Sequence, residues 1–134
     1  MPVINSYISP KRKMLTKAQR QEVYDKCKGH CAYCGCELEF KDMQVDHLIP
    51  LSGALTGGIS GADELSNMLP ACRSCNLDKS SFPLEWFRKN IEHFPEMLMR
   101  DNATYRKAVR FGLVEPKPHK VEFYFEKLGI EVPT

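Results

Sequence analysis

Two pairs of cysteines constrain the fold of this chain more than any other feature. Cys31 and Cys34 form one C-x2-C pair, and Cys72 and Cys75 form a second. Each pair can place two thiolates about 2.3 Å from one tetrahedral zinc ion. The 37 residues between the pairs exceed the insert of a short zinc finger, but lengthening a loop adds little to the cost of closing it. The sequence therefore predicts a structural Zn²⁺ site whose four ligands all come from the protein.

The sequence also suggests the compartment in which these thiols exist. A Lys-Arg-Lys run at residues 11–13 lies where a secretory signal would be apolar. No apolar stretch approaches the roughly 18 residues that cross a membrane. We therefore expect a cytoplasmic protein without membrane contact, in which cysteines bind metal rather than form disulfides. Cys36 is close enough to Cys34 to compete as a ligand, but C-x-C spacing suits tetrahedral zinc less well, so Cys27 and Cys36 are both expected to be small buried side chains.

Charge is unevenly distributed along the chain. The net charge of +2 is by itself weak evidence for nucleic-acid binding. Residues 1–30 hold seven Lys/Arg against two Asp/Glu, whereas residues 31–79 hold three against seven. A phosphate-contacting arm beside a cation-binding region would give this pattern, and so would a solvated basic tail. The candidate phosphate contacts of the arm are Lys11, Arg12 and Lys13.

Local signals predict the elements of the central region. Thr16 and Gln19 have the spacing of a capping box, which predicts the start of a helix. Two short strands are expected near residues 43–49 and 68–71, separated by a large glycine-rich loop at residues 51–65. A further helix should follow the second cysteine pair.

The C-terminal part shows a helical pattern. Four apolar residues step by three and four along one expected helix face: Leu84, Phe87, Ile91 and Phe94. Such residues, and the neighbouring Trp86, belong more often to a core than to a partner surface. Another helix is expected at residues 103–111. Residues 121–125 alternate as a strand would, although residues 126–128 could equally form a helix.

A second group of polar residues could bind a cation and move a proton. Asp46 and His47 are neighbours at the end of the first expected strand, so their side chains point to opposite faces. Asn67 ends the glycine-rich loop, and Asn76 and Lys79 lie one helical turn apart. Carboxylate and amide oxygens suit Mg²⁺ or Mn²⁺, and an imidazole suits a general base. Each residue alone has an ordinary structural explanation, but their combination favours a catalytic site.

The cysteine pairs and these polar residues, in this order and spacing, resemble the HNH endonuclease family. The resemblance covers about residues 27–80 and implies an α+β fold. Its core would be a ββα-metal (His-Me finger) module with a four-cysteine zinc knuckle, flanked by an N-terminal helix and C-terminal helices. We expect a basic arm at residues 1–15 and one nuclease domain at residues 16–134, with residues 81–134 as its helical extension.

The resemblance also implies a role for each residue. His47 would deprotonate the attacking water, while Asp46 and Asn76 would hold one Mg²⁺ or Mn²⁺ against the scissile phosphate of DNA. Asn67 would pin the loop and orient His47. Lys79 would either contact a phosphate of the substrate or brace its helix. The products would carry 5′-phosphate and 3′-hydroxyl ends.

Two other functions remain open at this point. A non-catalytic zinc ribbon could bind nucleic acid through its basic arm, but it would not need Asp46, His47 and Asn76 together. A nuclease could also act only as a homodimer or with a partner protein of a phage or bacterial defence system. The choice between DNA and RNA, sequence preference, and nicking or double-strand cutting are equally open.

Overall fold

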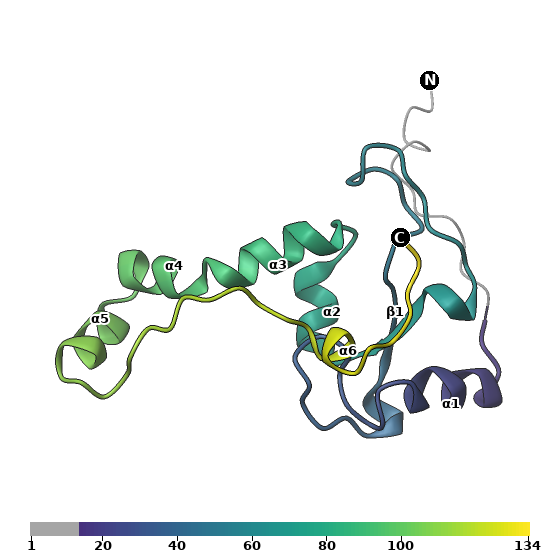
Figure 1. The fold of residues 1–134 in the computed structure, drawn as a ribbon, viewed down its shortest axis with the longest axis horizontal. Coiled ribbons are helices and arrows are strands. Elements are labelled where there is room, and N and C mark those ends of the chain that lie inside the picture. Colours follow the sequence, from purple (N-terminus) through teal and green to yellow (C-terminus); the bar gives the residue numbers. More distant parts are fainter. Residues whose placement is uncertain (1–13) are drawn as a thin grey trace. The chain divides into compact units, whose positions relative to one another are not determined.

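The computed structural model describes residues 14–134, which form two compact units. Unit 1 combines the described residues up to Leu84 with Glu122–Thr134, and unit 2 is Glu85–Val121 (Figure 1). The candidate phosphate contacts Lys11, Arg12 and Lys13 lie outside the described residues. No helix in the described part of the chain is long and apolar enough to cross a membrane.

Helix α1 (Lys17–Asp25) begins where the capping box predicts. The Thr16 hydroxyl accepts a hydrogen bond from the Gln19 backbone N–H at 3.1 Å, and the Gln19 side chain accepts one from the Thr16 N–H at 2.9 Å. Val23 of this helix is fully buried. It packs in a small core with Leu38, Met43 and Met68. This core fastens α1 to the sheet that carries the candidate site.

The sheet has two antiparallel strands, β1 (Gln44–His47) and β2 (Met68–Ala71). Their register pairs His47 with Met68 and Gln44 with Ala71. Both predicted strands are therefore confirmed, the first one shorter than expected. Short 3₁₀ turns precede each strand, at Phe40–Asp42 (η2) and Leu65–Asn67 (η3). Helix α2 (Arg73–Lys79) follows β2 directly and packs against β1, so two strands and one helix form the predicted module.

The segment between β1 and η3 contains no regular element, as its glycines predict. The Gly61 N–H donates to the Pro50 carbonyl at 2.8 Å, which fastens the end of the loop to its beginning. A Cβ atom at Gly61 would lie 1.9 Å from the carbonyl oxygen of Ile49. Only glycine allows this close approach. The loop therefore returns beside the end of β1 and carries its last residues to the site.

Unit 2 differs from the sequence expectation at Phe94. Helix α3 (Leu84–Glu92) ends before this residue, which instead begins α4 (Phe94–Asp101) and is 37% exposed. The reason is Pro95, which has no backbone N–H and therefore favours the first turn of a new helix. Helix α5 (Ala103–Arg110) follows, and Asn102 caps it by accepting the Tyr105 N–H at 2.8 Å.

The expected C-terminal strand is wrong. Residues 121–123 form no strand, and Tyr124–Lys127 form the short helix α6. The alternating apolar residues that suggested a strand include Phe123 and Phe125, which are both buried in unit 1. Backbone N–H groups of this segment donate to the first cysteine turn, including Phe125 to the Ala32 carbonyl at 2.8 Å. The C-terminal residues thus support the cysteine pairs.

Candidate active site and metal centre

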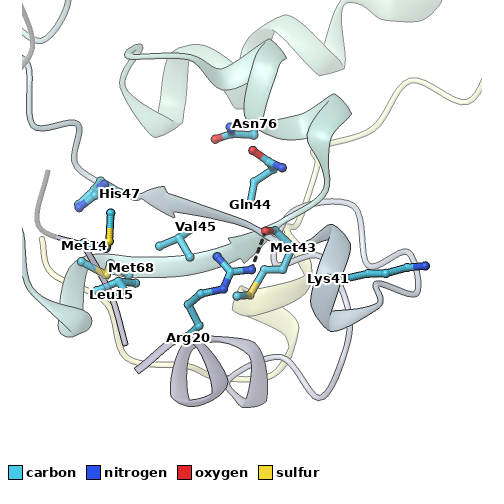
Figure 2. A pocket seen from close by; sticks show the side chains of 10 residues that line it. All are labelled: Met14, Leu15, Arg20, Lys41, Met43, Gln44, Val45, His47, Met68 and Asn76. Carbon is cyan, nitrogen blue, oxygen red and sulfur yellow. Dashed lines mark hydrogen bonds between the residues drawn. The ribbon is translucent and has the colours of Figure 1, made fainter. Parts of the chain in front are cut away.

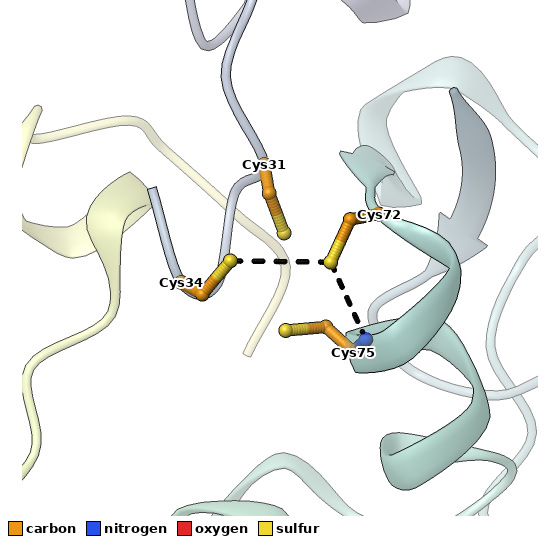
Figure 3. Close-up of side chains that lie close together, drawn as sticks. All are labelled: Cys31, Cys34, Cys72 and Cys75. Atoms are coloured by element: carbon orange, nitrogen blue, oxygen red, sulfur yellow. Dashed lines mark hydrogen bonds between the residues drawn. The ribbon is translucent and has the colours of Figure 1, made fainter. Parts of the chain in front are cut away.

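The four cysteines of the two pairs converge on one point (Figure 3). Their sulfur atoms all lie within 4.8 Å of one another, and those of Cys34 and Cys72 are 3.9 Å apart. Thiolates about 2.3 Å from a shared tetrahedral ion would be separated by about 3.8 Å. The cluster therefore has the ligand type and spacing of a metal-binding site.

Hydrogen bonds inside the cluster favour the thiolate form of Cys31. The Tyr33 N–H donates to Cys31 Sγ, and the Cys75 N–H donates to Cys72 Sγ, both at 3.4 Å. A hydrogen bond from Cys75 lowers the pKa of Cys31 to about 4. The same bond raises the pKa of Cys75 above its usual value.

The two remaining cysteines differ from each other. Cys27 is fully buried, as expected, and burial raises its pKa to about 11. Cys36 is exposed, so its expected burial is wrong. It follows Gly35, whose φ of +78° turns the chain sharply after the first pair. Neither thiol belongs to the converging set of four.

Asp46 is buried at the end of β1, on the side that contacts α2. Its Oδ2 atom accepts hydrogen bonds from the Tyr33 hydroxyl and from Lys79 Nζ, the latter at 3.0 Å. Burial raises the pKa of Tyr33 well above its usual value, so the phenol keeps the proton that it donates. Both bonds go to Oδ2, and within the described chain Oδ1 makes no hydrogen bond. This oxygen is available for a further polar contact.

Lys79 has no solvent exposure. Besides its contact with Asp46, its ammonium donates to the His47 carbonyl oxygen at 3.1 Å. Both contacts hold the end of β1 against α2. Of the two predicted roles, the position of Lys79 favours the brace over a contact with a phosphate.

His47 is buried, and its two ring nitrogens have different surroundings. Nε2 lies 2.8 Å from Oδ1 of Asp63, whose side chain is 15% exposed. Nδ1 is also buried but has no hydrogen-bond partner among residues 14–134. Sequence reasoning missed Asp63, because its only signal is a carboxylate near the end of a glycine-rich loop.

His47 and Asn76 line the same pocket, which has a volume of about 500 Å³ (Figure 2). Gln44 also lines it and points toward Asn76. Asp46 does not line this pocket but shares a cavity of about 20 Å³ with His47. Asn76 and Lys79 lie one turn apart on the same side of α2. Because Asp46 contacts Lys79, its carboxylate lies against the helix face that carries Asn76.

Asn67 ties the two ends of the glycine-rich loop together. It is buried, and its Oδ1 accepts the Ile49 N–H at 3.0 Å. Its Nδ2 donates to the carbonyl oxygens of Ile49 and Ala62, both at 2.9 Å. Ala62 directly precedes Asp63, so these bonds hold the part of the loop that meets His47. This geometry suits the predicted role in pinning the loop.

Aromatic residues near the C-terminus pack against Tyr33 and so support the site. The Tyr33 ring meets those of Phe123 and Phe125 edge to face, with centroids 5.5 and 6.1 Å apart. Such pairs stabilise a ring beyond the burial of its surface. They therefore fix the phenol that holds Asp46, a function that the sequence pattern did not reveal.

Comparisons with known proteins agree with this arrangement. Residues 31–82 match the family model described as HNH endonuclease. YoqL, an SPbeta prophage-derived protein of Bacillus subtilis assigned to the HNH endonucleases, is 31% identical over 93 residues, which are 63% of this chain and 38% of YoqL. The CRISPR-associated endonuclease Cas9 of Corynebacterium diphtheriae is 30% identical over 60 residues, 45% of this chain and 5% of that protein.

Among solved structures, the Type II-C Cas9 enzyme of Actinomyces naeslundii matches with a TM-score of 0.47 and 22% identity, covering 60% of this chain and 9% of that one. The chain spans well under half the length of the curated relatives that it matches. The segment that matches the family model includes both cysteine pairs together with Asp46, His47 and Asn76. In this segment, the chain is similar to the HNH endonuclease family.

Proposed function

We propose that this protein is a metal-dependent endonuclease that hydrolyses the phosphodiester bonds of DNA. The observation that carries the proposal is the arrangement of His47. Its Nε2 atom contacts Asp63, its buried Nδ1 atom has no partner among the described residues, and it shares a pocket with Asn76. A histidine held at one nitrogen and unpartnered at the other is suited to general-base catalysis.

In this proposal His47 takes a proton from the attacking water. The carboxylate of Asp63 accepts a hydrogen bond from Nε2–H. The neutral ring therefore carries its lone pair on Nδ1. The water oxygen forms a bond to phosphorus as its proton moves to Nδ1, and the bond from phosphorus to the 3′ oxygen breaks. The departing 3′ alkoxide takes a proton from a solvent water, and His47 later returns its proton to solvent. The products then carry 5′-phosphate and 3′-hydroxyl ends, as the family resemblance implies.

Asp46 and Asn76 would hold the catalytic cation, Mg²⁺ or Mn²⁺. Oδ1 of Asp46 and the amide oxygen of Asn76 are hard ligands of the kind that these ions prefer. A cation bound there would stabilise the negative charge that develops on the phosphate and the leaving oxygen. Lys79 would keep the Asp46 carboxylate in place through its contact with Oδ2. Arg20 and Lys41, which line the same pocket as His47, add positive charge beside it.

The four-cysteine cluster would hold Zn²⁺ as a structural ion. With all four positions filled by thiolates, the ion would have no open position for water or substrate. Its contribution would be to lock the turn at Cys31 to the start of α2. Because α2 carries Asn76 and Lys79, a structural zinc would set the position of both residues.

Removing the Asp63 carboxylate should slow cleavage without weakening DNA binding. For Asp63→Ala we expect kcat to fall by about 10- to 100-fold with KM nearly unchanged, because partners of this kind orient the reacting group. Asp63→Asn should retain more activity, because its amide oxygen can still accept a hydrogen bond from Nε2–H. ¹⁵N NMR of His47 should show the proton on Nε2 in the wild type and a mixture of tautomers in Asp63→Ala.

The matched control for this prediction is Glu64→Ala, which removes an exposed carboxylate one position further along the chain. It should leave both kcat and the His47 tautomer unchanged. If Asp63→Ala behaves like this control in both measurements, Asp63 has no positioning role.

Incubation with supercoiled plasmid tests the proposed function as a whole. The purified protein should nick or linearise the plasmid in Mg²⁺ or Mn²⁺ and should leave it intact when no divalent cation is supplied. An intact plasmid in every metal would contradict an autonomous DNA nuclease. In that case a zinc ribbon that only binds nucleic acid, an RNA substrate or a required partner protein would explain the chain better.

A further inference from the structure

The two units carry opposite net charge. The described part of unit 1 has twelve Asp/Glu and eight Lys/Arg, whereas unit 2 has five Asp/Glu and eight Lys/Arg. The described part of the unit that contains the candidate active site therefore carries a net negative charge, although the proposed substrate is a polyanion. Proteins bind nucleic acid largely through cations that neutralise its phosphates. Cations outside the described part of unit 1 would therefore favour binding of such a substrate.

In unit 2 the available cations concentrate in and after α5. Residues 103–121 contain five Lys/Arg and a single Asp/Glu. Four of these cations are exposed and form no ion pair within the described chain; we call them the basic face. The basic face consists of Lys107, Arg110, Lys117 and Lys120. Lys107 and Arg110 lie one turn apart on α5, so their side chains project from the same side of the helix.

Other cations of unit 2 are already engaged by acidic groups or carbonyl oxygens. Arg100 contacts Asp101 at 2.8 Å. Arg88 is nearly buried and contacts Glu85 at 3.0 Å. Arg106 donates to the carbonyl oxygens at the end of α4. The basic face differs from these cations by the absence of such contacts. Lys89 of α3 is also exposed and forms no ion pair among the described residues, and it differs from the basic face in lying outside the segment in and after α5.

Two exposed apolar side chains lie between Arg110 and Lys117 in the sequence. Phe111 is 74% exposed and Leu113 is 80% exposed. Between them Gly112, with a φ of +73°, ends α5 and turns the chain. Aromatic rings set among cations are used by nucleic-acid-binding proteins to stack on bases, and apolar side chains can enter the minor groove. Phe111 could therefore contact the same nucleic acid as the cations that flank it in the sequence.

We propose that the basic face binds the phosphate backbone of DNA, with Phe111 contacting the bases or sugars beside it. This inference rests on the proposed function for its choice of ligand. The contact holds the substrate through unit 2, while the residues of unit 1 perform the cleavage. It assigns a purpose to the C-terminal helices, which lie outside the segment that matches the HNH family model.

DNA binding by the full-length protein without added divalent cation tests this inference. The probe is a fluorescein-labelled 20-base-pair duplex, followed by anisotropy over a series of salt concentrations. Changing all four residues of the basic face to glutamine should lower the slope of log K against log salt by about 3 to 4, because each phosphate contact contributes about 0.9. Circular dichroism should show unchanged helix content.

Two single substitutions make the test specific. Phe111→Ala should weaken binding by about tenfold, as expected for a lost stacking contact, and should leave the salt slope unchanged. Arg100→Gln, which removes an exposed cation that Asp101 already neutralises, should change neither affinity nor slope. An unchanged affinity and slope in the fourfold variant would overturn the inference and would point to a protein partner for this surface.

The outcome is independent of the nuclease activity, because binding is measured without cleavage. If the wild type binds the duplex and the fourfold variant does not, the basic face is confirmed even when no cleavage occurs. If the wild type cleaves plasmid and the fourfold variant cleaves with the same KM, the nuclease stands and the basic face is wrong.

Discussion

Replacing His47 by alanine is expected to lower the rate of plasmid cleavage by about 10²- to 10⁴-fold, the usual contribution of a general base. The loss should appear in the rate of the chemical step, because Asp46 and Asn76 remain to hold the cation. Single-turnover cleavage of supercoiled plasmid in Mg²⁺ measures this rate directly. Zinc content, measured by mass spectrometry, should equal that of the wild type.

His93 provides the matched control. It is an exposed histidine of unit 2 that contacts Glu96 at 2.9 Å and takes no part in the candidate site. His93→Ala should cleave at the wild-type rate. If His47→Ala retains cleavage within a few-fold of this control, the general base is another group.

Replacing Cys72 by serine should have the largest effect on stability. Structural zinc contributes about 10 to 16 kcal/mol to the folding of zinc-finger peptides, so its loss would exceed the stability of most small domains. Cys72 is also the N-cap of α2, where its sulfur accepts the Cys75 N–H. We expect Cys72→Ser to bind no zinc, to lose its cooperative thermal unfolding transition and to lose cleavage activity.

Cys36→Ser is the control for this prediction, because Cys36 is exposed and is not one of the four converging cysteines, although its thiol contacts Cys34 and Cys72. It should bind one zinc ion per chain and unfold at the wild-type temperature. A Cys72→Ser protein that unfolds like this control, with its zinc content intact, would show that the four cysteines are not the zinc ligands.

The sequence predicted the features that depend on local spacing. A C-x2-C pair brings two sulfur atoms together whatever surrounds it, and two such pairs therefore indicated the cluster. Thr16 and Gln19 cap α1 through contacts three residues apart, which can be read from the sequence alone. The short strand at residues 68–71 was predicted correctly as a brief apolar segment between the glycine-rich loop and the second cysteine pair.

Features that depend on distant contacts could not be predicted in this way. Asp63 meets His47 only because the glycine-rich loop folds back beside β1, and no local pattern fixes that return. The Tyr33 hydroxyl holds Asp46, and the Tyr33 ring is itself held by the rings of Phe123 and Phe125, about 90 residues further along the chain. The same tertiary contacts explain why the segment with alternating apolar residues at 121–125 forms a buried turn and the start of a helix instead of a strand.

The measurement that tests the central claim most directly is the Mg²⁺ dependence of plasmid cleavage by the wild type and by Asn76→Ala. The claim is that Asn76 and Asp46 hold the catalytic cation beside His47. Wild-type protein that retains its zinc should cleave only after Mg²⁺ is added, and Asn76→Ala should need a Mg²⁺ concentration about tenfold higher or more, with unchanged zinc content. Identical Mg²⁺ curves for the two proteins, or full wild-type cleavage without added Mg²⁺, would contradict the account.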